Sequence, residues 1–267
     1  MPNDFPPLVD IAVNLTDKAF FKDLESVIER ATDAGISTLI VTGTDLSESE
    51  QALKLANSYP DIYSTAGIHP HYAKDAPSDY LNILKDLLKE EKVKAIGETG
   101  LDFNRNFSPS DQQIKIFEQQ LELACETGMP LLMHQRDAHP RFREMIQHYR
   151  DDISRAVLHC FTGTKEELYD CLDLDLHIGI TGWICDERRG EHLLPLLKDI
   201  PLNRLMLETD APYLLPRSLR PKPKSRRNEP TYLRHICEQA ALHLPINAVD
   251  LARSTTATAK EFFDITS

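Results

Sequence analysis

The chain repeats one pattern eight times: a short run rich in Val, Ile and Leu precedes a stretch whose apolar residues have helical spacing. The runs expected to form strands cover residues 8–14, 37–43, 61–71, 93–103, 130–137, 155–163, 175–182 and 204–212. Runs that are apolar throughout are typical of parallel strands covered on both faces. Eight such units in 267 residues favour an α/β fold of the (β/α)8 TIM-barrel type over an open doubly wound sheet. We expect residues 1–267 to form a single domain.

Two capping boxes and one glycine mark helix ends between these runs. Ser110 to Gln113 predicts the start of a long helix that ends at Gly128, and Thr164 to Glu167 predicts a second helix start. Two further helices are expected near residues 232–243 and 248–263. No glycine-rich phosphate loop follows any strand, so a dinucleotide site or a P-loop is not expected.

Charge and composition narrow the class of protein. The net charge of −12 argues against a broad electrostatic grip on duplex DNA, but not against an enzyme that engages a strand end. The chain has no apolar run long enough to cross a membrane and no secretory signal at its start, so a cytoplasmic enzyme is expected. The five cysteines include no C-x-x-C pair, which disfavours a disulfide framework or a zinc–thiolate site. If the strand through Cys160 alternates regularly, that thiol faces a helix.

Four potential metal ligands stand at the ends of predicted strands: Glu98, His134, His159 and Asp210. Their separations correspond to one, one and two strand–helix units of roughly 25–35 residues each. The carboxyl ends of barrel strands meet at one face, and chemistry in such barrels occurs there. Carboxylate and imidazole ligands suit Mg²⁺, Mn²⁺ or Zn²⁺. The spacing therefore indicates a metal-dependent hydrolase.

Other strand-end residues allow two interpretations each. His69 and His71 could contact a metal or substrate, or belong to a structured loop. Asp102 could orient a ligand histidine, as carboxylates near metal sites commonly do. Arg136 faces the same way as His134 along its strand and could bind a phosphate or pair with an acid.

The segment of residues 214–230 is broken by prolines and follows the last predicted strand directly. From Arg217 to Arg227 it holds six basic residues and no acid. It could be a solvated face or a lid over the metal site, because it leaves the strand that carries Asp210. Arg226, Arg227 and Asn228 offer donors suited to a phosphodiester. Outside this loop, Trp183 could stack on a base or pack within its own loop, and His177 is expected to be a packed histidine.

Six motifs in order resemble the TatD family of metal-dependent deoxyribonucleases. They read GIHPH, GETGLDF, MHQR, LHCFTGT, LETDAPYLLP and RRNEP, and the resemblance runs from about Val9 to Phe263. The VNLTD text at residues 13–17 adds to this resemblance. The resemblance implies a (β/α)8 barrel with divalent ions at the carboxyl face and 3′-to-5′ exonuclease action on single-stranded DNA or RNA. It also implies a place in repair after oxidative DNA damage.

The resemblance implies Glu98, His134 and His159 as metal ligands, with Asp210 as a ligand or proton acceptor. Many relatives carry an H-x-H pair on the first strand, where this chain has Ala12 and Asn14. That departure leaves the number of ions, one or two, open. We expect Mg²⁺, a monomer and no membrane partner.

From these residues we expect phosphodiester hydrolysis, with Glu98 and Asp210 as catalytic groups. His69, His71, Arg136, Arg226, Arg227 and Asn228 are expected to contact substrate. One alternative is a metal-dependent hydrolase of another ester, such as a D-aminoacyl-tRNA deacylase, because one fold hosts many reactions. A second is a binding protein that retains the barrel without catalysis.

Overall fold

The computed structural model describes residues 5–265. Its strands are β1 (Leu8–Val13), β2 (Ile36–Val41), β3 (Ile62–Ala66), β4 (Val93–Asp102), β5 (Leu131–Arg136), β6 (Ala156–Leu158), β7 (His177–Ile180) and β8 (Leu205–Leu207). The α-helices are α1 (Leu24–Asp33), α2 (Leu46–Ser58), α3 (Tyr80–Leu87), α4 (Ser110–Thr127), α5 (His139–Tyr149), α6 (Lys165–Asp173), α7 (Leu233–Ala241) and α8 (Ala248–Phe262). Short 3₁₀ helices are η1 (Pro70–Asp75), η2 (Gly182–Cys185), η3 (Glu191–Asp199), η4 (Leu202–Arg204) and η5 (Pro230–Tyr232).

The eight strands follow one another in chain order in one sheet, and helices separate them along the chain. All the strand pairs whose register is described are parallel. This order and direction define the (β/α)8 class, so the predicted fold class is confirmed.

The chain divides into two compact units. Unit 1 holds the described residues of Met1–Ile40, Cys160–Leu168 and His177–Ser267, and unit 2 consists of Val41–His159 and Tyr169–Leu176. That residues 1–267 form a single domain stays a prediction.

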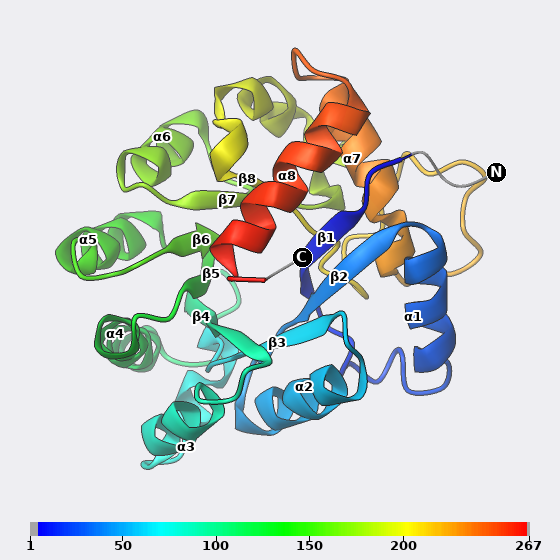
Figure 1. The fold of residues 1–267 in the computed structure, drawn as a ribbon. Coiled ribbons are helices and arrows are strands. Elements are labelled where there is room, and N and C mark those ends of the chain that lie inside the picture. Colours follow the sequence, from blue (N-terminus) through cyan, green and yellow to red (C-terminus); the bar gives the residue numbers. More distant parts are fainter. Residues whose placement is uncertain (1–4, 266–267) are drawn as a thin grey trace. The chain divides into compact units, whose positions relative to one another are not determined.

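Unit 2 contains β3, β4, β5 and β6, with α2 to α5 lying along them (Figure 1). Its strands are mostly buried, as the continuous apolar runs predict, and Phe117 of α4 stacks on Phe142 of α5. In unit 1, α8 lies against β1 and β8, and Phe262 packs its ring edge-to-face on His177 at 4.9 Å. His177 is thus a packed histidine, as expected from the sequence.

Several predicted strands extend beyond the observed ones because the chain turns sharply at their exits. β6 ends at Leu158, and Cys160 has a φ of 48°. β8 ends at Leu207, and Asp210 has a φ of 53°. Non-glycine residues seldom adopt this left-handed region. The expectation that Cys160 alternates outward along a strand was therefore wrong, because Cys160 lies beyond the strand.

Glycines let β4 approach β5 closely. Gly100 is paired with His134 in the register of the two strands and has a φ of 138°. A Cβ atom at Gly100 would collide with the carbonyl oxygen of His134, and one at Gly97 would collide with that of Leu132. The two glycines therefore leave room for the backbone of the neighbouring strand.

The two predicted capping boxes have different outcomes. Thr164 and Glu167 form theirs, since each side chain accepts a hydrogen bond from the other residue's backbone N–H. The Ser110–Gln113 box is not formed. Gln113 is fully buried, and its amide donates to the carbonyl oxygens of Asp102 and Ser108 and accepts from the N–H of Asp102. Gln113 thus binds the exit of β4 to α4.

Two glycine substitutions test how closely β4 and β5 pack. Gly128 also has a positive φ, of 70°, but a Cβ atom there meets nothing within 4 Å. Gly128→Ala should cost only backbone strain, about 1 kcal/mol of unfolding free energy. Gly100→Ala adds a collision with strand backbone and should cost at least about 3 kcal/mol. Urea unfolding monitored by circular dichroism measures both, and equal losses would contradict the close approach.

Candidate metal centre

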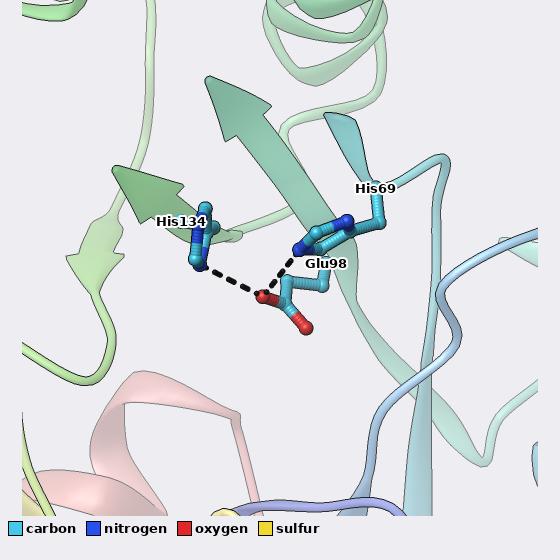
Figure 2. Close-up of side chains that lie close together, drawn as sticks. All are labelled: His69, Glu98 and His134. Carbon is cyan, nitrogen blue, oxygen red and sulfur yellow. Dashed lines mark ion pairs between the residues drawn. The ribbon is translucent and has the colours of Figure 1, made fainter. Parts of the chain in front are cut away.

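Glu98 is the central residue of a cluster in unit 2. It lies within β4, is only 6% exposed, and its backbone N–H donates to the carbonyl oxygen of Gly43 at 2.7 Å. Figure 2 shows its carboxylate between the imidazoles of His69 and His134. A charged side chain buried this deeply needs compensating partners.

Three histidines supply those partners, and all three approach the same oxygen, Oε1 of Glu98. The distances to it are 3.2 Å from Nε2 of His69, 3.3 Å from Nδ1 of His134 and 2.8 Å from Nε2 of His159. His69 follows β3, His134 lies in β5, and His159 follows β6 directly. We call these four residues the histidine–glutamate cluster.

The charges of the cluster suit cation binding. Burial alone would raise the pKa of Glu98, but His159, His69 and His134 outweigh it and hold the pKa well below its usual value. Burial lowers the pKa of His69 to about 4. Near neutral pH, Glu98 is therefore ionised and His69 is neutral, which are the states in which both residues ligate metals.

A second carboxylate, Asp102 at the end of β4, supports the cluster. Its Oδ2 lies 2.8 Å from Nε2 of His71 and 3.4 Å from Nε2 of His134. Burial would raise the pKa of Asp102, but the nearby imidazoles of His134 and His71 lower it far below its usual value. The sequence-based expectation that Asp102 orients a ligand histidine agrees with these contacts.

The donor set fits a divalent ion. His69, Glu98 and His134 each offer one ligand atom, and these atoms lie within 4.8 Å of one another. Two ligands on an ion with bonds of about 2.0–2.2 Å lie roughly 3.0–3.5 Å apart, and the contacts of Glu98 with His69 and His134 fall in that range. The side chain of His134 is 19% exposed, so the cluster is reachable from solvent.

Four of the predicted site residues of unit 2 therefore come together. Glu98, His134 and His159, expected as ligands, share one cluster with His69, which the sequence had indicated as a substrate contact. The signal for His69 as a ligand was its place at a strand end, the same criterion that selected the others.

Asp210 lies in unit 1, and its membership of the same centre stays a prediction. Asn14 donates from Nδ2 to Oδ1 of Asp210 at 3.0 Å, so the first strand contributes an orienting amide where many relatives have a histidine. Sequence reasoning missed Glu208, which is fully buried and accepts a hydrogen bond from the N–H of Cys160. Its position two residues before Asp210 in the predicted strand of residues 204–212 was the available signal, because alternate residues of a strand share a face.

The basic loop is anchored within unit 1. Arg227 makes a bidentate pair with Asp23, with both contacts at 2.8 Å, and also binds Glu229 at 2.7 Å. Asn228 is fully buried, and its amide donates to the carbonyl oxygen of Thr209. The side chains of Arg227 and Asn228 thus hold the loop in place, and Arg226 beside them is exposed. That these three residues contact substrate stays a prediction.

Trp183 packs within its own loop. Its Nε1 donates to the carbonyl oxygen of Arg189 at 3.2 Å, and the Arg189 guanidinium lies 4.3 Å from the ring centroid. These contacts favour loop packing over base stacking for Trp183. All five cysteines are free, as expected.

The comparisons with known proteins decide the family. Residues 9–264 match the model of the TatD related DNase family. The chain belongs to this family. The chain is 50% identical over 259 residues to the 3′-5′ ssDNA/RNA exonuclease TatD of Erwinia tasmaniensis, covering 97% of this chain and all of that one. It is 51% identical to the protein of the same name from Citrobacter rodentium, covering 97% and 98%.

Solved structures agree with this assignment. The crystal structure of a TatD homolog from Escherichia coli superposes with a TM-score of 0.88 at 25% identity, covering 97% of this chain and 98% of that one. A TatD family hydrolase from Entamoeba histolytica gives 0.89 at 26% identity, covering 99% and 100%. Within residues 5–265, no helix of this TatD family member combines the length and apolarity needed to span a membrane.

Asp10 is a buried acid that contacts Thr209, the residue before Asp210, and its pKa predicts how stability depends on pH. Asp10 is fully buried, and its carboxyl accepts from the N–H of Thr209 at 2.9 Å and contacts the Thr209 hydroxyl at 2.5 Å. Burial raises the pKa of Asp10 from 3.8 to about 8. Between these values the folded protein holds a proton that the unfolded chain releases, so this acid lowers stability progressively as pH rises.

Asp10→Asn removes that titration while its amide can reproduce both contacts with Thr209. We expect the variant and the parent to unfold at similar temperatures near pH 4. The variant should gain a Tm advantage that grows up to about pH 8, by at least about 2–4 °C. Differential scanning calorimetry in chelator at a series of pH values measures this. An advantage that shrinks with rising pH would contradict the protonated state of Asp10.

Proposed function

We propose that this chain is a metal-dependent 3′-5′ exonuclease that hydrolyses phosphodiester bonds of single-stranded DNA and RNA. The observation that carries the proposal is the histidine–glutamate cluster in a chain of the TatD family. Relatives half identical over almost the whole chain carry the name 3′-5′ ssDNA/RNA exonuclease. A role in repair of oxidative DNA damage, which the family resemblance implies, belongs to the proposal, and so does the cytoplasmic location expected from the sequence.

The proposed ligands are Glu98, His134 and His159, together with Asp210. The proximity of His69 to Glu98 and His134 supports its inclusion. Mg²⁺ is the proposed ion, with Mn²⁺ or Zn²⁺ as substitutes, and one or two ions can be held. A divalent ion supplies charge neutralisation for the phosphate oxygens and lowers the pKa of the attacking water.

The chain's own residues do the remaining work. Asp210 accepts the proton of the attacking water, and its hydrogen bond from Asn14 keeps one carboxylate oxygen oriented for that task. Asp102 holds the imidazoles of His71 and His134 in place. Arg136 and Arg226 neutralise the phosphate. Arg227 and Asn228 position the loop that carries Arg226, in addition to the substrate contact predicted for both.

In the alternative function, a D-aminoacyl-tRNA deacylase, the same cluster would serve to cleave the ester bond between the amino acid and the tRNA. The names of the curated relatives favour nuclease action. Assays of a D-aminoacyl-tRNA and of single-stranded oligonucleotides under the same conditions compare the two functions directly. If the D-aminoacyl-tRNA is cleaved faster than the oligonucleotides, the deacylase is the better assignment.

Glu98→Gln tests the cluster, because it removes the charge around which the three histidines gather. We expect the rate of single-strand cleavage in Mg²⁺ to fall at least about 100-fold, since both charge neutralisation and ligand geometry are lost. A 5′-labelled oligonucleotide should give a shortening ladder with the parent protein and none with the variant. Chelator should abolish cleavage by the parent protein.

Glu126→Gln is the matched control, because Glu126 is an exposed acid of unit 2 that pairs with Lys85. It should cleave like the parent. Thermal unfolding with and without Mg²⁺, Mn²⁺ or Zn²⁺ adds a readout independent of turnover, because an ion that binds only the folded state raises Tm. A metal-induced rise in Tm that survives in Glu98→Gln would remove Glu98 from the ligand set.

The two neighbouring arginines of the basic loop should separate substrate binding from folding. Arg226→Glu should raise KM for oligonucleotides several-fold with little change in Tm, because Arg226 is exposed. Arg227→Gln breaks the pairs with Asp23 and Glu229 and should cost about 1 kcal/mol of stability. Steady-state kinetics and thermal unfolding measure the two effects, and an unchanged KM in Arg226→Glu would contradict the proposed phosphate contact.

A further inference from the structure

An exposed segment beside the histidine–glutamate cluster carries residues that the proposed reaction has not used. Residues 104–107, with the sequence Asn-Arg-Asn-Phe, join β4 to α4, and all four side chains are exposed. Phe107 is 54% exposed, although it is one of the larger apolar side chains. We call these four residues the exit arm.

The exit arm contacts His71, which lies next to the histidine–glutamate cluster. The ring of Phe107 lies edge-to-face with the imidazole of His71, with 4.7 Å between centroids. His71 in turn lies 4.3 Å from the His69 ring and 6.4 Å from the His134 ring. The phenyl ring is therefore separated from the cluster by a single imidazole, a span that one nucleotide can bridge.

The conformation of the arm is held by hydrogen bonds. Oδ1 of Asp102 accepts from the N–H groups of Asn104 at 3.0 Å and Arg105 at 2.8 Å. The Ser108 hydroxyl, at the far end, donates to the carbonyl oxygen of His71 at 2.8 Å. Asp102 thus binds His71 through one carboxylate oxygen and the arm through the other. Such an arm is preorganised and loses little entropy when a ligand binds.

The charges of the arm suit a nucleic-acid backbone. Arg105 is exposed, and among residues 5–265 its guanidinium has no described ion pair. The nearby acid Asp137 accepts a hydrogen bond from the amide of Asn104 at 2.6 Å. The chain as a whole has a net charge of −12, which repels nucleic acid. An exposed arginine close to the cluster offers a local positive charge that can bind a backbone phosphate.

We propose that the exit arm is a nucleotide-binding site, in which Phe107 stacks on an unpaired nucleobase next to the cleaved bond and Arg105 neutralises a backbone phosphate. The proposal rests on the proposed function, because it concerns the strand held for cleavage. Stacking on an aromatic side chain tolerates every base but needs an exposed base face. Base pairing and stacking in a duplex cover that face, so the arm favours single strands.

Binding without turnover tests the stacking. Fluorescence anisotropy of a labelled single-stranded octamer in chelator should show Kd raised about 5- to 100-fold in Phe107→Ala, the range expected for loss of one stacked base. Phe107→Trp should bind like the parent, and Phe107→Leu should resemble the alanine variant. Tyr169→Ala, which removes an exposed aromatic ring from α6, is the matched control and should bind like the parent. Parent-like binding by Phe107→Ala or by Phe107→Leu would overturn the proposal.

Salt dependence tests Arg105. Arg105→Gln should reduce the slope of log K against log salt by about 0.7, the value for one phosphate contact on a single strand. Arg141→Gln removes an exposed arginine that already pairs with Glu144 at 2.7 Å, and it should leave the slope unchanged. An unchanged slope in Arg105→Gln would remove the phosphate contact.

Oligonucleotides with one abasic position near the 3′ end connect the arm to cleavage. The parent protein should slow several-fold at one abasic position, and Phe107→Ala should show no such additional loss at that position. Equal sensitivity of both proteins at every position would refute the stacking. If the parent cleaves no strand at all, the proposed function fails, while the anisotropy measurements still report on the arm.

Discussion

The convergence of three imidazoles on Oε1 of Glu98 is the interaction on which the candidate metal centre depends. Burial disfavours a charged carboxylate, and the histidines overcome that cost, so Glu98 remains ionised. The arrangement is possible because Gly97 and Gly100 let β4 approach β5 closely, which brings His134 to the cluster. Within unit 2, the close packing of the two strands therefore sets the geometry of the cluster, and that geometry keeps Glu98 charged.

Asp102 connects the histidine–glutamate cluster to the exit arm. Its two carboxylate oxygens serve different structures: one contacts His71 and His134, and the other holds the backbone of the exit arm. The same side chain therefore orients the histidines proposed for chemistry and the residues proposed to hold the nucleotide. Gln113 fixes the backbone of Asp102 from α4, so a helix behind the sheet supports both.

Much of the fold and part of the site could be predicted because they depend on local patterns. Apolar runs at regular spacing identified the strands, and their ends selected Glu98, His134 and His159, which the structure brings together in unit 2. Local sequence patterns did not predict side-chain contacts between residues that are distant in sequence. The predicted substrate contact of Arg227 stays a prediction, and its pairing with Asp23 was not foreseen, because no local pattern connects the two residues. Gln113 looked like a helix cap, but the turn after β4 offered it three backbone partners.

The order of strands, the (β/α)8 class and the gathering of the candidate ligands on neighbouring strands were determined by the sequence alone, since hydrophobic periodicity and strand direction dictate them. Only the tertiary structure decided which nitrogen faces which oxygen, that His69 joins the cluster, and that Asp102 holds both the histidines and the exit arm. Those outcomes depend on strand register, left-handed exits and close backbone approach. These features arise from packing between segments remote along the chain, which periodicity within one segment does not encode.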